Sequence, residues 1–200
     1  MLRDGNAENE RTARQASAAP GDGRAGGDAA RTLGLGRPMR RAHQELSEAE
    51  ALRELERGEY GTLAVIGEAG YPYAVPVNYV VLDGRIYLHC AKAGHKLDAI
   101  RADDRVCLTV VTYARAVPSE YTEYYRSVIA FGRAHVVEDE RERLASLRAL
   151  GDRFWPGHDR ELDEEVARSG GRCLMVRVDV ERLTGKVSKE LVGIAAGERP

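Results

Sequence analysis

The sequence contains few lysines and cysteines and no long apolar run. The scarcity of cysteine and of apolar runs excludes several classes of protein. The three cysteines, Cys90, Cys107 and Cys173, are widely spaced and odd in number, which argues against a disulfide framework and predicts buried free thiols. No CxxC, HExxH or Cys/His cluster with zinc-ligand spacing occurs. No stretch approaches the ~18 consecutive apolar residues of a membrane span. A formal net charge of −2 gives no reason to expect nucleic acid or an anionic membrane as a partner.

The chain of 200 residues is long enough for one domain with a substantial core. Residues 1–38 contain no aromatic residue and few large apolar ones, so they are predicted to form a disordered N-terminal tail, and Met39 is a hypothetical translation start. Residues 39–192 are predicted to form the domain and residues 193–200 a C-terminal tail. The N-terminal segment resembles neither a secretory signal nor a transit peptide, so a cytoplasmic location is expected.

Short runs rich in Val, Ile and Tyr, separated by turn residues, predict six strands, mostly joined as hairpins. A capping box at Ser47 and Glu50 predicts a helix that ends at Gly58, and two further helices are expected from about Asp139 and Asp159. This pattern favours a mainly β, antiparallel barrel with flanking helices over a parallel βαβ sheet. The predicted strands are Tyr60–Ile66, Tyr73–Leu82, Arg85–Cys90, Val106–Val111, Arg126–Val137 and Arg172–Val180.

The most informative segment is Tyr87–Ile100, where a predicted strand breaks at Gly94 and continues as a short helix. The unpaired N–H groups at a helix N-terminus, the freedom of Gly94 and the charge of Lys96 suit a phosphate monoester. The chain has four lysines against 26 arginines, and they form two pairs, Lys92 with Lys96 and Lys186 with Lys189. We therefore predict that the two pairs are two halves of one anion-binding site. The alternative is that they lie by chance on solvated loops.

Two polar residues are predicted to point away from the core beside this turn. Counting outward from the Asp83-Gly84 hairpin turn pairs Asn78 with His89, which lies one residue before the predicted strand breaks. Asn78 offers a donor and an acceptor that could bind the edge of a heterocycle. His89 fits either a functional role or a structural hydrogen bond.

Three other features are weaker. Ser127 lacks the GxSxG elbow of a hydrolase, so a hydrolytic triad is not expected. The predicted loop 113–125 holds several tyrosines that could stack on an aromatic ring or cover the barrel mouth. The segment Thr184-Gly185-Lys186 is expected to form a cationic turn after the last strand.

The order of these motifs resembles the pyridoxamine 5′-phosphate oxidase-like flavoproteins, in particular the small 5-nitroimidazole reductase-like branch. The likeness runs from about Met39 to Lys189. An arginine-rich phosphate motif is replaced here by Gly94-His95-Lys96, which argues against pyridoxamine phosphate as the substrate. The motifs are Gly58-Glu59-Tyr60-Gly61, Tyr73-Ala74-Val75-Pro76-Val77-Asn78-Tyr79, His89-Cys90-Ala91 through Gly94-His95-Lys96-Leu97, Tyr125-Arg126-Ser127-Val128-Ile129 with Phe131-Gly132, Phe154-Trp155-Pro156-Gly157 and Thr184-Gly185-Lys186.

The resemblance implies a six-stranded antiparallel split β-barrel homodimer that binds FMN at the subunit interface. It implies that a strand lies along the isoalloxazine ring, that a strand end and the following turn hold the ribityl chain and phosphate, and that Ser127 and Lys186 approach the flavin. The residues that carry these roles are Pro76, Val77, Asn78 and Tyr79 for the ring, and His89, Cys90, Ala91, Gly94, His95 and Lys96 for the ribityl phosphate.

The leading hypothesis is an FMN-dependent oxidoreductase, similar to flavin reductases and nitroreductases. It would pass electrons from a small reduced donor to a small planar acceptor such as a nitroimidazole or quinone, with His89 as the catalytic residue. The main alternative is a non-catalytic flavin- or haem-binding protein of the same fold, with His89 as an axial ligand in the haem case. A third is a cofactor-free interaction domain.

Overall fold

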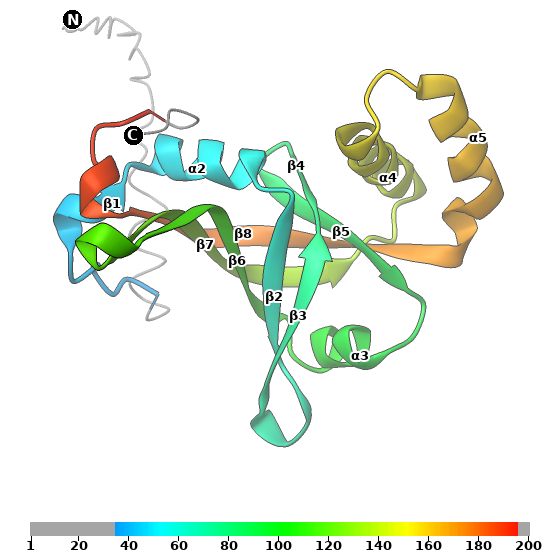
Figure 1. Cartoon of the computed structure of the whole chain (residues 1–200). Coiled ribbons are helices and arrows are strands. Elements are labelled where there is room, and N and C mark those ends of the chain that lie inside the picture. Colours follow the sequence, from blue (N-terminus) through cyan, green and yellow to red (C-terminus); the bar gives the residue numbers. More distant parts are fainter. Residues whose placement is uncertain (1–34, 196–200) are drawn as a thin grey trace, which may run out of the picture.

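A computed structural model describes residues 35–195 and shows one curled antiparallel sheet that forms a half-barrel with flanking helices (Figure 1). Along the sheet the described strands pair in the order β3-β2-β6-β7-β8-β5-β4, and β1 pairs with β8 off this path. The strands are β1 (Glu45–Leu46), β2 (Tyr60–Ile66), β3 (Pro72–Asn78), β4 (Val80–Leu82), β5 (Arg85–Ala91), β6 (Arg105–Val117), β7 (Thr122–Val136) and β8 (Cys173–Val187).

The predicted mainly β, antiparallel fold is confirmed, but the described residues contain eight strands rather than six. One addition is the two-residue β1. The other arises because the predicted strand Tyr73–Leu82 is divided at Tyr79, where the chain changes its pairing partner from β2 to β5. The Tyr79 side chain is fully buried, and its hydroxyl donates a 2.5 Å hydrogen bond to the Leu55 carbonyl.

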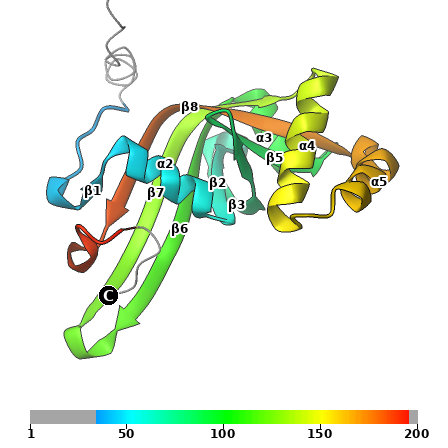
Figure 2. The same cartoon turned by 90° about the horizontal axis from the view of Figure 1, so that it is seen from above.

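Two predicted loops are in fact strand. The tyrosine-rich segment 113–125 belongs to the long β6–β7 hairpin, whose tip is Pro118–Tyr121 and which extends away from the barrel in Figure 2. Thr184-Gly185-Lys186 lies within β8, where a Cβ on Gly185 would come within 2.9 Å of Leu46 and Ala51. That glycine therefore allows close packing of α2 and β1 on β8, and it does not mark a turn.

Four α-helices complete the described chain, and two predictions made from short sequence motifs are confirmed. The Ser47 hydroxyl and the Glu50 carboxylate form the predicted capping box, and the helix ends at Gly58. The Asp83-Gly84 turn has φ values of 50° and 73°, as a two-residue hairpin turn requires. The helices are α2 (Glu48–Arg57), α3 (His95–Ala102), α4 (Glu140–Phe154) and α5 (Asp159–Ser169).

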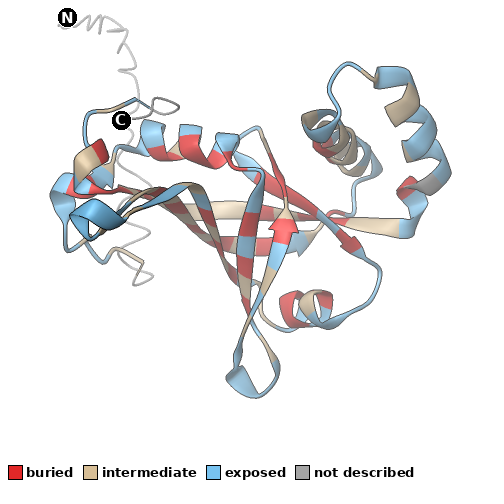
Figure 3. Cartoon of the chain, viewed as in Figure 1, coloured by how far each residue is buried: buried red, intermediate tan, exposed pale blue. Residues whose placement is uncertain are grey.

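The core lies on the inner face of the curled sheet, where buried and exposed residues alternate along the strands (Figure 3). Leu63, Leu108 and Val128 are fully buried there, and α2 and α3 pack against the same core. On the outer face, α4 covers β4, β5 and the start of β8 through a second cluster that includes Tyr87, Leu150 and Met175. The cysteines are free thiols, but only Cys90 is buried.

The outer face of β2, β3, β6 and β7 is left uncovered by the described helices. Its side chains are mostly apolar and partly or largely exposed: Val111 retains 58% of its accessible surface and Ile66 retains 40%. Monomeric proteins rarely leave so wide an apolar sheet face open to water. Among the described helices, none is long and apolar enough to cross a membrane.

The two predicted tails lie largely outside the described residues. Residues 35–38 form neither helix nor strand, and Arg182 donates a hydrogen bond to the Arg37 carbonyl. At the other end, the Ile194 and Ala195 carbonyls accept hydrogen bonds from Arg126. The described start of the C-terminal tail therefore packs against β7.

Candidate functional site

The turn between β5 and α3 presents unpaired backbone donors to solvent. Gly94 has φ 133° and ψ 162°, a conformation open to glycine, and a Cβ built there would meet nothing within 4 Å. No side chain caps α3, and the carbonyl of Gly94 accepts from Leu97 and Asp98. The N–H groups of His95 and Lys96, in the first turn of the helix, are therefore available to an anion.

The Lys96 ammonium acts electrostatically on two residues at the end of β5, His89 and Cys90. Desolvation, and then the nearby Lys96 ammonium, lower the pKa of His89 below its usual 6.5. The pKa of the Cys90 thiol is raised by burial, and Lys96 opposes that shift. His89 is therefore mainly neutral at pH 7, although its side chain is exposed at the rim of a pocket.

The pH dependence of His89 tests this proximity. Its ring should titrate with a midpoint below 6.5, and Lys96→Gln should move the midpoint part of the way back, because desolvation is the larger cause and remains. The measurement is an NMR titration of the five histidines, with Lys92→Gln as the control for a nearby but separate charge. A His89 midpoint unchanged by Lys96→Gln would show that the two side chains do not interact.

His89 and Asn78 line one pocket of about 480 Å³, although they do not pair across a hairpin. Asn78 pairs with Tyr60 on β2, and His89 pairs with Met175 on β8, so the predicted Asn78–His89 strand pair is wrong. The register counted from the turn holds only as far as Val80 with Tyr87. Both side chains nevertheless lie on the outer face of the sheet and line one pocket with residues of α4 and α5. The prediction that they share a site did not depend on the strand pair alone.

The predicted ring-binding strand is exposed on one face and buried or half-buried on the other. Pro76 is exposed on the outer face, whereas the Val77 and Tyr79 side chains face the core. On β5, Ala91 is exposed and Cys90 is buried. Val77, Tyr79 and Cys90 could therefore contact an outer-face ligand only through backbone atoms.

The His95 side chain is held against β3. Its ring stacks on that of Tyr73, with centroids 4.1 Å apart and planes 18° apart. This contact ties the first residue of α3 to the strand that carries Pro76 and Asn78. Tyr73 packs against the core on the face of β3 opposite to Pro76, so the stack fixes the turn at the inner side of the strand.

Ser127 and Lys186 lie side by side at another part of the sheet. They are Cα partners on β7 and β8, and the Lys186 ammonium lies 5.3 Å from the centroid of the Tyr125 ring. Along β8, Lys186 comes eleven residues after Met175, the partner of His89, which is roughly 35 Å of strand path at about 3.3 Å per residue. Within one chain the two lysine pairs therefore do not form one site.

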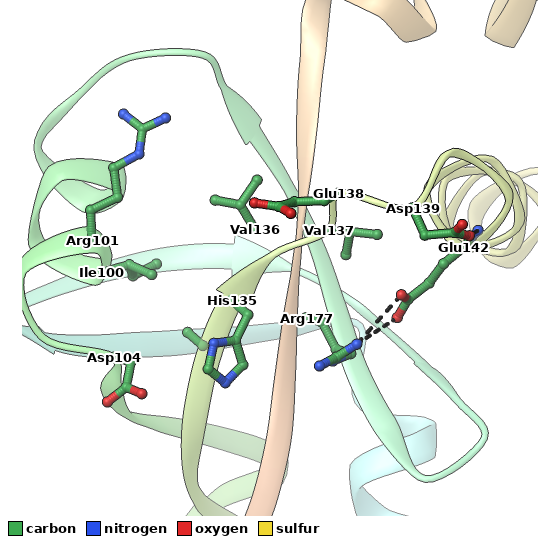
Figure 4. A pocket seen from close by; sticks show the side chains of 11 residues that line it. Ile100, Arg101, Asp104, His135, Val136, Val137, Glu138, Asp139, Glu142 and Arg177 are labelled. Carbon is green, nitrogen blue, oxygen red and sulfur yellow. Dashed lines mark hydrogen bonds and ion pairs between the residues drawn. The ribbon is translucent and has the colours of Figure 1, made fainter.

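A larger pocket, of about 710 Å³, lies between α3 and the start of α4 but contains none of the predicted site residues (Figure 4). In the figure Arg177 points toward Glu142, and the two atoms joined, Nη1 and Oε1, are 3.1 Å apart. Arg177 also pairs with Asp179 at 3.0 Å, and Asp104 pairs with Arg133 at 2.7 Å. Arg101, the other arginine of the lining, lies 4.0 Å from Asp98, so among the described residues each arginine of this pocket already has a carboxylate partner.

Helices α4 and α5 contribute pocket residues that were not predicted from the sequence. Leu147, Phe154, Leu162 and Val166 of α4 and α5 line the pocket that contains Asn78 and His89, and Cys173 of β8 joins them. The spacing of Leu162 and Val166, four residues apart in an otherwise acidic helix, was the available signal of a buried stripe.

A comparison with models of protein families shows which family the chain belongs to. A family model described as pyridoxamine 5′-phosphate oxidase matches residues 47–187. The chain belongs to this family. A comparison with curated proteins found no match.

Several solved structures are similar to this chain. One is a conserved hypothetical protein of Mycobacterium tuberculosis, with 24% identity, a TM-score of 0.66, and coverage of 81% of this chain and 97% of that one. Another is a FAD and haem binding protein of Mycobacterium smegmatis, with 23% identity, a TM-score of 0.63, and 74% of each chain covered. A third, a candidate 5-nitroimidazole antibiotic resistance protein of Bacteroides thetaiotaomicron, has 19% identity, a TM-score of 0.59, and coverage of 72% and 86%. These likenesses support the family's fold.

Proposed function

We propose that the chain binds FMN and passes electrons from a reduced nicotinamide or similar donor to a small planar acceptor. The observation that carries this proposal is the arrangement at the end of β5, where the open α3 N-terminus, the Lys96 charge and the Asn78–His89 pocket adjoin one another. Membership of the family and the FAD-binding neighbour support a flavin. A cradle with one lysine and two backbone donors fits a monophosphate, which favours FMN.

The residues present fit such a group. Lys96 and the N–H groups of the α3 turn would hold the phosphate, and the exposed face at Pro76 would lie against the ring. Asn78 could orient the ring or the acceptor by hydrogen bonding. When bound, the flavin supplies the electron-transfer chemistry. His89, neutral at pH 7, can donate a hydrogen bond from one ring nitrogen to an acceptor oxygen and accept a proton at the other.

We further propose a homodimer in which Ser127 and Lys186 of one subunit complete the site of the other. Two observations support it: Lys186, the strand partner of Ser127, lies far along β8 from Met175, the strand partner of His89, and the apolar outer face has no cover in residues 35–195. A second copy packed on that face would bury Val111 and Ile66. It would also account for the two separated lysine pairs.

The dimer is tested by a charge on its proposed interface. Val111→Asp should convert a dimer to a monomer, because an unpaired carboxylate would be desolvated on association. Light scattering after size-exclusion chromatography measures the mass. Ala167→Asp on the exposed side of α5 is the control and should stay dimeric. A wild-type monomer would overturn the proposed assembly.

The activity is tested under anaerobic conditions with protein loaded with FMN. NADH or NADPH should bleach the yellow flavin band, and a quinone or nitroimidazole should restore it. A protein that takes up no flavin, or one that purifies with a haem Soret band and no flavin, would contradict the proposal. If the bound flavin stays oxidised with every donor, the protein binds flavin without turnover, and the proposed oxidoreductase activity is contradicted.

A further inference from the structure

The pocket beside His89 has apolar walls provided mainly by two helices. Leu147, Leu150 and Phe154 come from α4, and Leu162 and Val166 from α5, while the sheet contributes Asn78, His89 and Cys173. Its volume of about 480 Å³ lies within the range of roughly 300–1,000 Å³ that suits small organic ligands. Figure 1 shows α4 and α5 standing off the sheet at the end of the barrel where this pocket lies.

Two side chains in the pocket can hydrogen-bond a ligand. Among residues 35–195, the side chains of Asn78 and His89 form no hydrogen bond with another residue. The Asn78 amide can donate two hydrogen bonds, and neutral His89 can donate one. A ligand that carries oxygen acceptors on an aromatic ring would satisfy both groups while its ring lies against Leu150 and Phe154.

The pocket lining has few charged side chains, which disfavours charged ligands. Among the described residues, the lining contains no lysine or arginine, and its one carboxylate, Glu165, is exposed and paired with Arg168. An anion or cation within these apolar walls would therefore be desolvated without a partner, which disfavours charged ligands. The Gly94–Lys96 turn adjoins the pocket without lining it, so a phosphate held at that turn would lie outside the apolar walls.

We propose that this pocket binds an uncharged quinone and that α4 and α5 form the acceptor site of the enzyme. The inference rests on the proposed function and names its substrate class. In the net reaction, a reduced nicotinamide gives two electrons and one proton, one further proton comes from water, and the quinone becomes a hydroquinone. Both quinone oxygens gain a proton, and the nicotinamide is oxidised.

The single tryptophan offers a readout that does not depend on flavin. Trp155 follows Phe154 directly, is 52% exposed and stacks on His158. Menadione, an uncharged naphthoquinone, should quench its fluorescence saturably in flavin-free protein. Val166→Phe, which fills the pocket, should weaken this binding by about tenfold or more. Ala167→Phe adds the same ring at the neighbouring exposed position and should leave the binding unchanged.

The second test measures turnover with menadione as the electron acceptor. With FMN-loaded protein, Val166→Phe should lower kcat/KM for menadione by about tenfold or more, while Ala167→Phe, outside the lining, should leave it unchanged. Phe154→Ala, at a residue 38% exposed, serves as a second variant if Val166→Phe does not fold, and should also weaken menadione binding.

The outcomes separate the two proposals. Absence of saturable quenching in the wild type, or equal losses in Val166→Phe and Ala167→Phe, would overturn the quinone pocket even if FMN binds and is reduced. Failure to bind FMN, with menadione binding intact, would overturn the proposed function and leave the pocket as a quinone site. Haem that displaces menadione and produces a Soret band would overturn the assignment to a quinone.

Discussion

Replacing Lys96 with alanine should weaken FMN binding by about 10- to 150-fold. A charge-assisted hydrogen bond to phosphate contributes about 1.5–3 kcal/mol, and each 1.36 kcal/mol is a factor of ten. The ammonium lies beside the α3 turn, close enough to His89 to lower the pKa of its ring. Titration of flavin fluorescence at fixed ionic strength measures the change in Kd.

Two comparisons make this result specific. Lys92→Ala removes an exposed positive charge four residues earlier and should change the Kd for FMN by less than about threefold, as a screened surface charge does. Riboflavin lacks the phosphate, so Lys96→Ala should leave its affinity unchanged. Equal losses for FMN and riboflavin would place Lys96 at the ring or the ribityl chain and would contradict a phosphate cradle.

Replacing Glu54 with leucine should lower the free energy of unfolding by about 3–5 kcal/mol, because it leaves the buried Arg126 charge without its carboxylate partner. Glu54 and Arg126 retain 1% and 6% of their side-chain surface, and their closest charged atoms are 3.5 Å apart. The Thr112 hydroxyl also donates to the Glu54 carboxylate at 2.5 Å. Urea unfolding followed by circular dichroism at one protein concentration measures the change.

A paired variant and a matched control test the cause. Glu54→Leu combined with Arg126→Met removes both charges and should recover much of the loss, since an apolar pair of similar volume replaces a buried ion pair at little cost. Glu56→Leu changes an exposed carboxylate on the same helix and should alter stability by about 0.5 kcal/mol or less. A double variant as unstable as Glu54→Leu would show that packing, and not the unpaired charge, determines the loss.

The parts of the fold that could be predicted from the sequence are those set by neighbouring residues. The Ser47–Glu50 capping box, the Asp83-Gly84 turn and the glycine break before α3 each depend on a few adjacent residues, and each is present. The alternation of apolar residues likewise predicted the inner face, because a strand with one buried face has a period of two.

The features that were mispredicted depend on contacts between distant residues. Gly185 resembles a turn residue, but it is required because Leu46 and Ala51 pack closely on β8. The ribbon near Tyr125 continues because β6 and β7 pair with each other beyond the barrel, and its polar and aromatic sequence gives no clear strand signal. The burial of Glu54 depends on Arg126 of β7, and no local pattern indicates it.

The candidate site shows the same division. Gly94 and Lys96 could be identified from one continuous segment, because the turn that holds them is local. The pairing of Asn78 with His89 was predicted by extending a hairpin that ends at Val80, whereas the two residues line one pocket because β3 and β5 contact each other in the curled sheet. The role of the α4–α5 pair could not be predicted, because it depends on where the two helices pack on the sheet.

A crystal structure of the protein grown with FMN tests the central claim most directly. The phosphate should lie within hydrogen-bond distance of Lys96 Nζ and of the His95 and Lys96 backbone N–H groups, with the ring against the exposed face at Pro76. Ser127 and Lys186 near the ring should come from a second copy of the chain. Flavin bound with its phosphate away from the Gly94–Lys96 turn, or a ring contacted by Ser127 of the same chain, would contradict the account.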